Sequence, residues 1–360
     1  VQHGVAWGVL HAVVATARTE AMTTPALPAR GFAWRLWSLL ALACVVVLVA
    51  SLMLGSVKLS PAEVWRALFF GNSGGDGLAA GIVTELRLPR AGAAFAAGGL
   101  LAFAGALMQM LLRNPLADPY VLGVSGGGAV AALTAMLFSL PWWAVQTSAG
   151  AGALLSMALV AALARQHLWR GEPGEANARL LLGGVVMASG WVGLITLILT
   201  VAPENKLRGM IFWMVGDLGG ADRYAGALVA LVAAVAVVLP HARDLNVLLT
   251  GETRARALGV PVARVRALIY VVASLCTAVA VTIAGSVAFV GLLVPHMVRL
   301  AWTRDVRIHL PATAMAGGGL LMLADLIART LIAPTQLPVG VITTLLGVPT
   351  FLYLLMRSAR

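Results

Sequence analysis

Long apolar runs separated by short polar segments make up most of this chain. A helix needs about 20 apolar residues to cross the hydrocarbon core of a membrane, and runs of that order recur from residue 35 to the end. The pattern predicts ten spans, near residues 35–55, 91–112, 119–139, 143–165, 179–201, 222–239, 264–284, 291–302, 311–330 and 338–356. We therefore predict an all-α fold, a polytopic membrane protein with about ten transmembrane helices.

Some segments between and beside the spans carry signals of their own. The eighth span is too short to cross alone and follows the glycine-rich stretch 285–291. We expect a broken helix there, completed by irregular backbone packed inside the protein. An amphipathic turn is expected at 61–70 in the outer segment, and a short helix at 207–214 is apolar enough to lie along the outer interface.

A charged turn with two prolines, residues 113–128, separates the second and third spans. Because each proline lacks an N–H and biases the preceding residue away from helix, we expect Asn114 and Asp118 to end one helix and cap the next. Three glycines at 126–128 then open a helix suited to close backbone contact with a neighbour. An ordinary hairpin between two spans accounts for the prolines and Asp118 equally well.

The composition agrees with the membrane assignment. Sixty per cent of the 360 residues are apolar, 11% are charged and the mean hydropathy is +0.93, far from the mix of a soluble domain. The net charge of +11 would suggest nucleic acid in a soluble chain. Basic residues also collect in cytoplasmic loops of membrane proteins, so we favour membrane lipid, and no nucleic acid, as the partner. Cys44 and Cys276 lie inside apolar runs, which does not support a disulfide framework.

Charge also orients the chain. With ten spans both termini lie on one side, and placing them in the cytoplasm puts 17 of the 25 basic residues inside. Spans two to five then begin outside and spans seven to ten inside, so the halves would form an inverted repeat, a layout common in transporters. Residues 1–34 form an N-terminal leader in this interpretation. Met22 looks like a natural start, so we expect residues 1–21 to carry no function.

Catalytic machinery is not indicated. A phosphate-binding loop of the Walker type needs Gly-Lys-Ser/Thr, yet Lys58 and Lys206, the two lysines, follow Val57 and Asn205. The six histidines show no paired spacing on one helix face, which argues against a metal cluster. We predict no bound cofactor and no enzyme activity for this chain.

The inner loop 241–266 contains a predicted short helix, closed by Gly259 and stopped by Pro261. Its apolar side chains are Leu248, Leu249, Ala255 and Leu258. A short amphipathic helix projecting inward fits a groove on a soluble partner. A surface helix held at the lipid headgroups by its arginines explains the pattern equally well.

Arginines gather on the predicted outer face at Arg87, Arg90 and Arg329. Arginine forms forked hydrogen bonds to carboxylates, so these side chains could hold an acidic docking protein. They could instead anchor to lipid phosphates or pair with Glu85 and Asp325. Asp325 lies four residues before Arg329, a helical spacing that permits such a pair.

Eight segments, taken in order, resemble motifs of a known family. They are Leu86-Arg87-Leu88-Pro89-Arg90, Arg113-Asn114-Pro115-Leu116-Ala117-Asp118-Pro119, Leu122-Gly123-Val124-Ser125-Gly126, Phe212-Trp213-Met214-Val215-Gly216, Gly251-Glu252 to Leu258-Gly259, Phe289-Val290-Gly291-Leu292-Leu293-Val294-Pro295-His296, Leu323-Ala324-Asp325 and Leu337-Pro338-Val339-Gly340. The family comprises the membrane subunits of bacterial ABC importers for vitamin B12, ferric siderophores and haem. The likeness runs from about residue 35 to the end.

The resemblance implies a ten-helix permease domain over residues 35–360 that forms a homodimer with the pathway along its two-fold axis. Two cytoplasmic ATPase subunits, which hold ATP and magnesium, and a periplasmic substrate-binding protein complete the implied assembly. The implied location is the bacterial inner membrane, multi-pass, with both termini cytoplasmic.

The resemblance also assigns roles by position. Arg87, Arg90 and Arg329 match arginines that meet acidic residues on the binding protein. The helix that couples to the ATPase matches Leu248, Leu249, Gly251, Glu252, Ala255, Leu258 and Gly259. The inner gate matches Ala176, Asn177 and Ala178. The vitamin B12 permeases carry small hydroxyl residues at the gate, so a different cargo or gate is compatible with this departure.

The predicted function is therefore import of an iron chelate from periplasm to cytoplasm by alternating access, driven by a separate ATPase chain. Haem is the first choice of cargo, ferric siderophore the second and vitamin B12 the third. The rival from another class is a proton- or sodium-coupled secondary transporter, with Asp325 or Asp118 as the ionisable group.

Overall fold

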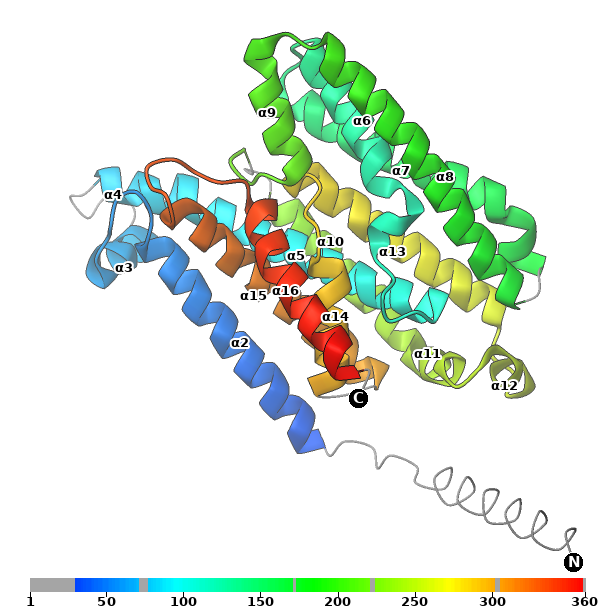
Figure 1. The fold of residues 1–360 in the computed structure, drawn as a ribbon. Coiled ribbons are helices and arrows are strands. Elements are labelled where there is room, and N and C mark those ends of the chain that lie inside the picture. The colour runs from blue at the N-terminus through cyan, green and yellow to red at the C-terminus, as the bar shows by residue number, and fades with distance from the viewer. Residues whose placement is uncertain (1–29, 71–76, 171–172, 221–223, 302–304, 359–360) are drawn as a thin grey trace, which may run out of the picture. The chain divides into compact units, whose positions relative to one another are not determined.

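The computed structural model describes residues 30–70, 77–170, 173–220, 224–301 and 305–358, with side chains except at 30, 121–122, 164–170, 173–181, 355 and 357–358. Most of the expected leader lies outside the described residues. Within these ranges every regular element is helical (Figure 1). The helices formed by the apolar runs are α2 (Arg30–Met53), α5 (Leu88–Leu112), α6 (Val124–Leu137), α7 (Trp142–Arg170), α8 (Pro173–Val201), α10 (Tyr224–Val238), α13 (Val262–Ala284), α14 (Val290–Ala301), α15 (Val306–Thr330) and α16 (Val339–Ser358).

Each predicted span corresponds to one of these helices, which confirms the all-α polytopic prediction. In the part of the chain that the structure describes, seven helices are long and apolar enough to cross a membrane. The other three, α6, α14 and α16, are shorter apolar helices. The shorter elements between them are α3 (Pro61–Phe70), α4 (Gly77–Gly81), η2 (Ile82–Arg87), η3 (Pro119–Leu122), α9 (Glu204–Val215), η4 (Leu239–His241), α11 (Ala242–Leu249) and α12 (Glu252–Ala257).

The third span begins later than its apolar run. The Asp118 carboxylate accepts the N–H of Tyr120 at 2.7 Å and caps η3, a single 3₁₀ turn. Gly123 closes that turn at φ 72, a left-handed conformation that favours glycine, and α6 starts only at Val124. Asp118 is thus a helix cap, as predicted, but the helix it caps is this short turn.

A second interruption precedes α14. Gly285 and Phe289 both have positive φ, and α14 then begins at Val290 after irregular backbone. This confirms the broken eighth span. The interruptions before α6 and α14 follow α5 and α13, so each half of the chain has a short second helix, which agrees with the predicted inverted repeat. The two interrupted regions touch, because a Cβ on Gly291 would lie 2.8 Å from the Pro119 ring.

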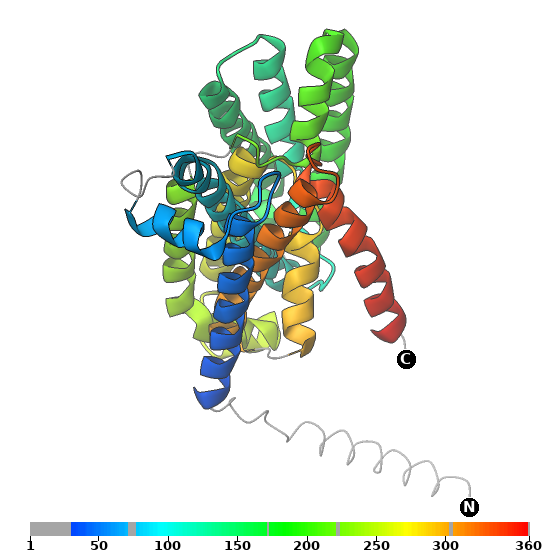
Figure 2. The same cartoon turned by 90° about the vertical axis from the view of Figure 1, so that its left-hand side faces the viewer.

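Among the spanning helices that the structure describes, the most enclosed is the segment Gly77–Leu112, which ends in α5 and whose apolar part is 94% buried. Small residues make this possible, since alanine and glycine let neighbouring backbones approach closely. A Cβ on Gly98 would overlap the carbonyl oxygen of Gly317 in α15, and a Cβ on Gly105 would overlap that of Gly291 in α14. Helix α14 lies beside α15 in turn (Figure 2).

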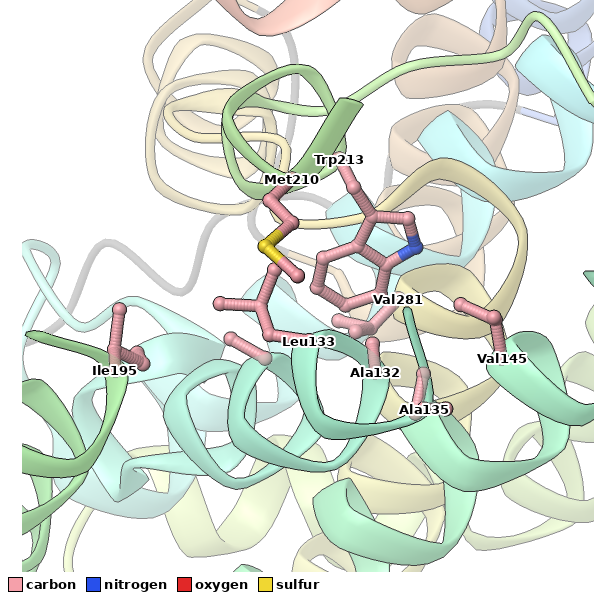
Figure 3. Packing of buried hydrophobic residues seen from close by; sticks show 10 residues of the cluster. Ala132, Leu133, Ala135, Val145, Ile195, Met210, Trp213 and Val281 are labelled. Atoms are coloured by element: carbon pink, nitrogen blue, oxygen red, sulfur yellow. The ribbon is translucent and has the colours of Figure 1, made fainter. Parts of the chain in front are cut away.

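A second cluster of buried residues joins α6, α7, α8, α9 and α13. Gly127 of α6 and Gly152 of α7 meet backbone to backbone, which confirms the predicted role of the glycine run. Met210 and Trp213 of α9 pack over Leu133 (Figure 3). The predicted short helix at 207–214 lies within α9, and these two side chains face the protein core, whereas Ile211 is exposed. Its place along the outer interface stays a prediction.

Two ends of the helix bundle can be assigned from contacts between distant residues. The first turn of α5 meets the last turns of α15 through Arg90 and Asp325. At the other end, Arg113 after α5 contacts Leu248 of α11, and Asp305 before α15 contacts α11 as well. We call the first the outer end and the second the inner end, following the orientation predicted from charge.

Candidate functional site

A pocket of about 650 Å³ lies at the outer end. Its polar lining consists of Ser56, Glu85, Arg87, Arg90, Arg329 and Gln336. The structure therefore brings together the three outer arginines that the sequence singled out, from η2, α5 and α15. Their guanidinium groups share this region with the carboxylates of Glu85, which lines the pocket, and of the nearby Asp325 and Asp217.

The buried carboxylate of Asp325 joins two of these arginines. Arg90 Nη2 lies 2.9 Å from Asp325 Oδ1, and Arg329 Nε lies 3.0 Å from Asp325 Oδ2. Arg90 also donates from Nη1 to Gln336 Oε1 at 2.7 Å. A buried acid needs such charged partners because leaving it unpaired is costly. The ion pair between Asp325 and Arg329 that the helical spacing permitted is confirmed. Arg90 forms a second ion pair with the same carboxylate.

Arg87 is bound differently, since it holds the end of α2. Its Nη1 donates to the carbonyl oxygen of Leu52 at 2.6 Å, and its Nη2 donates to that of Val57. The last carbonyls of a helix lack partners within the helix and favour a nearby cation. Gly55 leaves the room for this, because a Cβ there would lie 2.8 Å from Arg87 Nη2.

Gly55 and Gln336 are pocket residues that the sequence analysis missed. Gly55 lies in a polar, glycine-rich segment, and nothing in the local sequence indicates that it leaves room for the side chain of Arg87. The outer arginines are also less accessible than expected, with Arg87 5% and Arg329 7% exposed. An acidic group could reach them only by entering the pocket.

The inner segment differs from the single short helix that was predicted. It forms two helices, α11 and α12, separated at Gly251, whose φ of 134° strongly disfavours any residue with a side chain. The predicted apolar face is split as a result. Leu248 and Ala255 are buried, whereas Leu249 is 42% and Leu258 71% exposed.

Glu252 faces the protein, not solvent. Its carboxylate forms a buried ion pair with Arg266 of α13, and Arg256 lies 3.9 Å away on the exposed side. This pair fixes α12 against the start of α13. Helix α12 therefore projects Leu258 outward from a position that the buried pair determines.

The predicted gate residues, Ala176, Asn177 and Ala178, fall near the beginning of α8. Their side chains lie outside the described residues, so the gate assignment stays a prediction. Among the described residues, no group of three or more His, Cys, Asp and Glu side chains is arranged to hold a metal ion.

Comparison with known proteins identifies the family. The FecCD transport family model matches residues 43–357. The vitamin B12 import system permease protein BtuC of Salmonella schwarzengrund is 38% identical over 323 residues, which cover 88% of this chain and 94% of the relative. The same protein from Salmonella typhi is similar to the same extent.

Two solved structures are similar as well. A metal-chelate type ABC transporter in an inward-facing conformation matches with a TM-score of 0.78 and 28% identity, over 89% of this chain and 98% of that one. PsaBC from Streptococcus pneumoniae in complex with Fab matches with a TM-score of 0.52 over 76% of this chain and 92% of that one; at 15% identity this likeness concerns the fold alone. With the family model covering nearly all of the spanning region, this chain belongs to the FecCD transport family, as the membrane permease subunit of an ABC importer.

Proposed function

We propose that this chain forms the membrane passage of an importer whose energy comes from separate ATPase subunits bound at the inner end. The observation that supports this proposal most directly is the short helix α12 followed by the exposed side chain of Leu258. A short helix fixed by a buried ion pair, with a large apolar side chain 71% exposed beyond it, suits a groove on a soluble partner. Two such ATPase subunits, each holding ATP and magnesium, would serve a homodimer of this chain.

The outer pocket is the proposed docking site for a periplasmic substrate-binding protein. Arg90 and Arg329 line it with Arg87, and guanidinium groups of this kind can bind an acidic side chain through paired hydrogen bonds. This placement puts the binding protein and the ATPase at opposite ends of α5 and α15. The proposed location is the bacterial inner membrane with both termini in the cytoplasm, and the start of α8 remains the proposed inner gate.

For the cargo we propose a metal chelate with a large organic ligand. Haem is the first choice from the sequence. Vitamin B12 is a second candidate that a specific observation favours, since the relatives at 38% identity are named as vitamin B12 permeases. Ferric siderophore is the third. Equilibrium binding of haem, cyanocobalamin and a ferric siderophore to the cognate binding protein separates the three.

Reconstitution in vesicles tests the function. We expect the purified chain to co-elute with an ATPase, and uptake of the bound cargo to require ATP and to persist in the presence of an uncoupler. A proton- or sodium-coupled transporter would instead take up cargo without ATP and would stop when the uncoupler is added. Accumulation of cargo against its gradient by this chain alone, without a second protein, would refute the proposal.

A further inference from the structure

One side chain of α11 forms hydrogen bonds with the start of α15. Asn246 uses both ends of its amide, with Nδ2 donating to Asp305 Oδ1 at 2.9 Å and Oδ1 accepting the backbone N–H of Val306 at 3.0 Å. Asp305 is the N-cap of α15, and its Oδ1 also accepts the N–H of Arg307 at 3.0 Å. Because the first N–H groups of a helix have no partner within it, Asn246 and Asp305 together satisfy that end of α15.

A second, independent tie joins α11 to α5. Arg113, the C-cap of α5, donates from Nη2 to the carbonyl oxygen of Leu248 at 3.1 Å. A cation in the last turn of a helix is favourable, and Leu245 and Leu248 of the same helix are buried. Both α5 and α15 therefore hold α11.

Helices α5 and α15 are themselves packed as one unit. Their backbones meet at Gly98 and Gly317, and at the outer end Arg90 pairs with Asp325. Each helix has 25 residues, or roughly 37 Å at 1.5 Å per residue. Close-packed helices shift as units and do not deform continuously. A displacement of α11 would therefore act on both helices that extend to the outer pocket.

We propose that Asn246 and Asp305 are a positioning pair, which transmits movement along α15 between the inner segment and the outer pocket. This inference rests on the proposed function, because it assumes an ATPase at the inner end and a binding protein at the outer end. The two residues would act through α15, whereas Leu258, which directly follows α12, is the side chain placed to touch the ATPase.

The test compares ATP hydrolysis by the assembled complex with and without cargo-free binding protein. Asn246→Asp keeps an acceptor for Val306 but sets a second carboxylate against Asp305. We expect basal hydrolysis near the wild-type rate and a loss of about fivefold or more in the stimulation by the binding protein. The exchanged variant Asn246→Asp with Asp305→Asn again sets an amide against a carboxylate and restores most of the stimulation.

Asn114→Asp is the matched control. It adds the same charge at the same end of the protein, in an exposed turn where a carboxylate can still accept the N–H of Leu116. It should leave stimulation unchanged, as should Asp305→Asn, which keeps the oxygen that caps α15.

The inference would be overturned if Asn246→Asp showed full stimulation by the binding protein. It would also be overturned if the exchanged variant, Asn246→Asp with Asp305→Asn, failed to restore the lost stimulation. If Asn246→Asp does not assemble, the exchanged variant decides, because recovery of assembly and stimulation supports the pair and failure to recover overturns it. A wild-type chain that binds no ATPase would contradict the proposed function instead.

Discussion

At the scale of single residues, small side chains set the distances between helices. Gly105 of α5 lies against the backbone of Gly291 in α14, and the ring of Pro119 also packs close to Gly291. A side chain at position 105 would have to displace the backbone of Gly291, which cannot adjust as the end of a flexible side chain can. One methyl group is therefore enough to separate these helices.

We predict that Gly105→Ala destabilises the protein by about 1–3 kcal/mol or prevents folding, because overpacking a close contact costs that much. Thermal unfolding in detergent measures the change. Gly226→Ala in α10 is the control, since a Cβ there meets nothing within 4 Å. Equal unfolding temperatures for the two variants would show that the contact is looser than described.

Charge in the outer pocket gives a second prediction. Arg90→Gln removes one of the positive charges and should weaken docking of the binding protein by about 1 kcal/mol, or roughly fivefold in Kd. Glu85→Gln, on the exposed wall of the same pocket, should strengthen it. Titration calorimetry at low and high salt checks both, because salt screens exposed charges. Affinity that is unaffected by either change at low salt would rule out docking at this pocket.

At the scale of elements, each short helix depends on a few local bonds. Helix α3 begins with a capping box in which the Glu63 carboxylate accepts the N–H of Ser60 at 2.6 Å and its hydroxyl at 2.7 Å. The Glu63 N–H in turn donates to Ser60 Oγ at 3.3 Å. Reciprocal bonds of this kind satisfy the free N–H groups at a helix start.

These bonds make α3 sensitive to acid. The Ser60 hydroxyl, followed by its N–H, holds the pKa of Glu63 below its ordinary value. The charged form is favoured in the folded state, so the cap is complete above the usual glutamate pKa of about 4.3. Its contribution is lost as the pH falls through the lowered pKa. Hydrogen exchange of the α3 amides, corrected for intrinsic rates, should therefore accelerate in acid.

Glu63→Gln provides the control for this prediction, because it keeps an acceptor for Ser60 but cannot titrate. Exchange in that variant should not change with pH beyond the intrinsic rate. Acid acceleration of the same size in both proteins would assign the effect to another group.

Because the break at Gly251 leaves Leu258 exposed and Leu248 buried, we expect substitution of the first to affect ATPase binding and substitution of the second to affect stability. Leu258→Asp changes a side chain that is 71% exposed and should leave the unfolding temperature unchanged while reducing co-purification of the ATPase. Leu248→Asp places a charge at a position that is 4% exposed and should cost about 3 kcal/mol or more. Undiminished ATPase binding by the first variant would remove α12 from the proposed contact.

At the scale of the whole molecule, the two ends contain different chemistry. The outer end holds the pocket and the buried Asp325, and the inner end holds Asn246, Glu252 and their partners. Arg87, Arg90 and Arg329, which the charge pattern placed on one side of the membrane, lie at one end, and Arg113 and Arg266, placed on the other side, lie at the opposite end. The side of the membrane on which each end lies still depends on that charge bias.

Labelling from outside intact cells tests the orientation. In a Cys44→Ser, Cys276→Ser background, Glu85→Cys should react with a thiol reagent that cannot cross the membrane, and Leu258→Cys should react only after lysis. Both side chains are exposed in the structure. The opposite pattern of labelling would invert the predicted topology.

Much of this architecture could be predicted from local sequence. The length of each apolar run determines whether it can span a membrane, and the short run after 285–291 indicated its own break. Asp118 and the glycines at 126–128 were interpretable because caps and close helix contacts depend on neighbouring residues. The exposed apolar side chain of Leu258 was among those predicted, but the break at Gly251 was not.

The sequence by itself determined the class of the protein, its spans and its family, because hydrophobic length and short motifs are local properties. Only the tertiary structure decided that Arg87 binds the end of α2, that Arg90 pairs with Asp325 across 235 residues, and that Met210 and Trp213 of α9 face the core. Those outcomes depend on which elements meet in space, since an ion pair or a buried face needs a partner that no local pattern specifies.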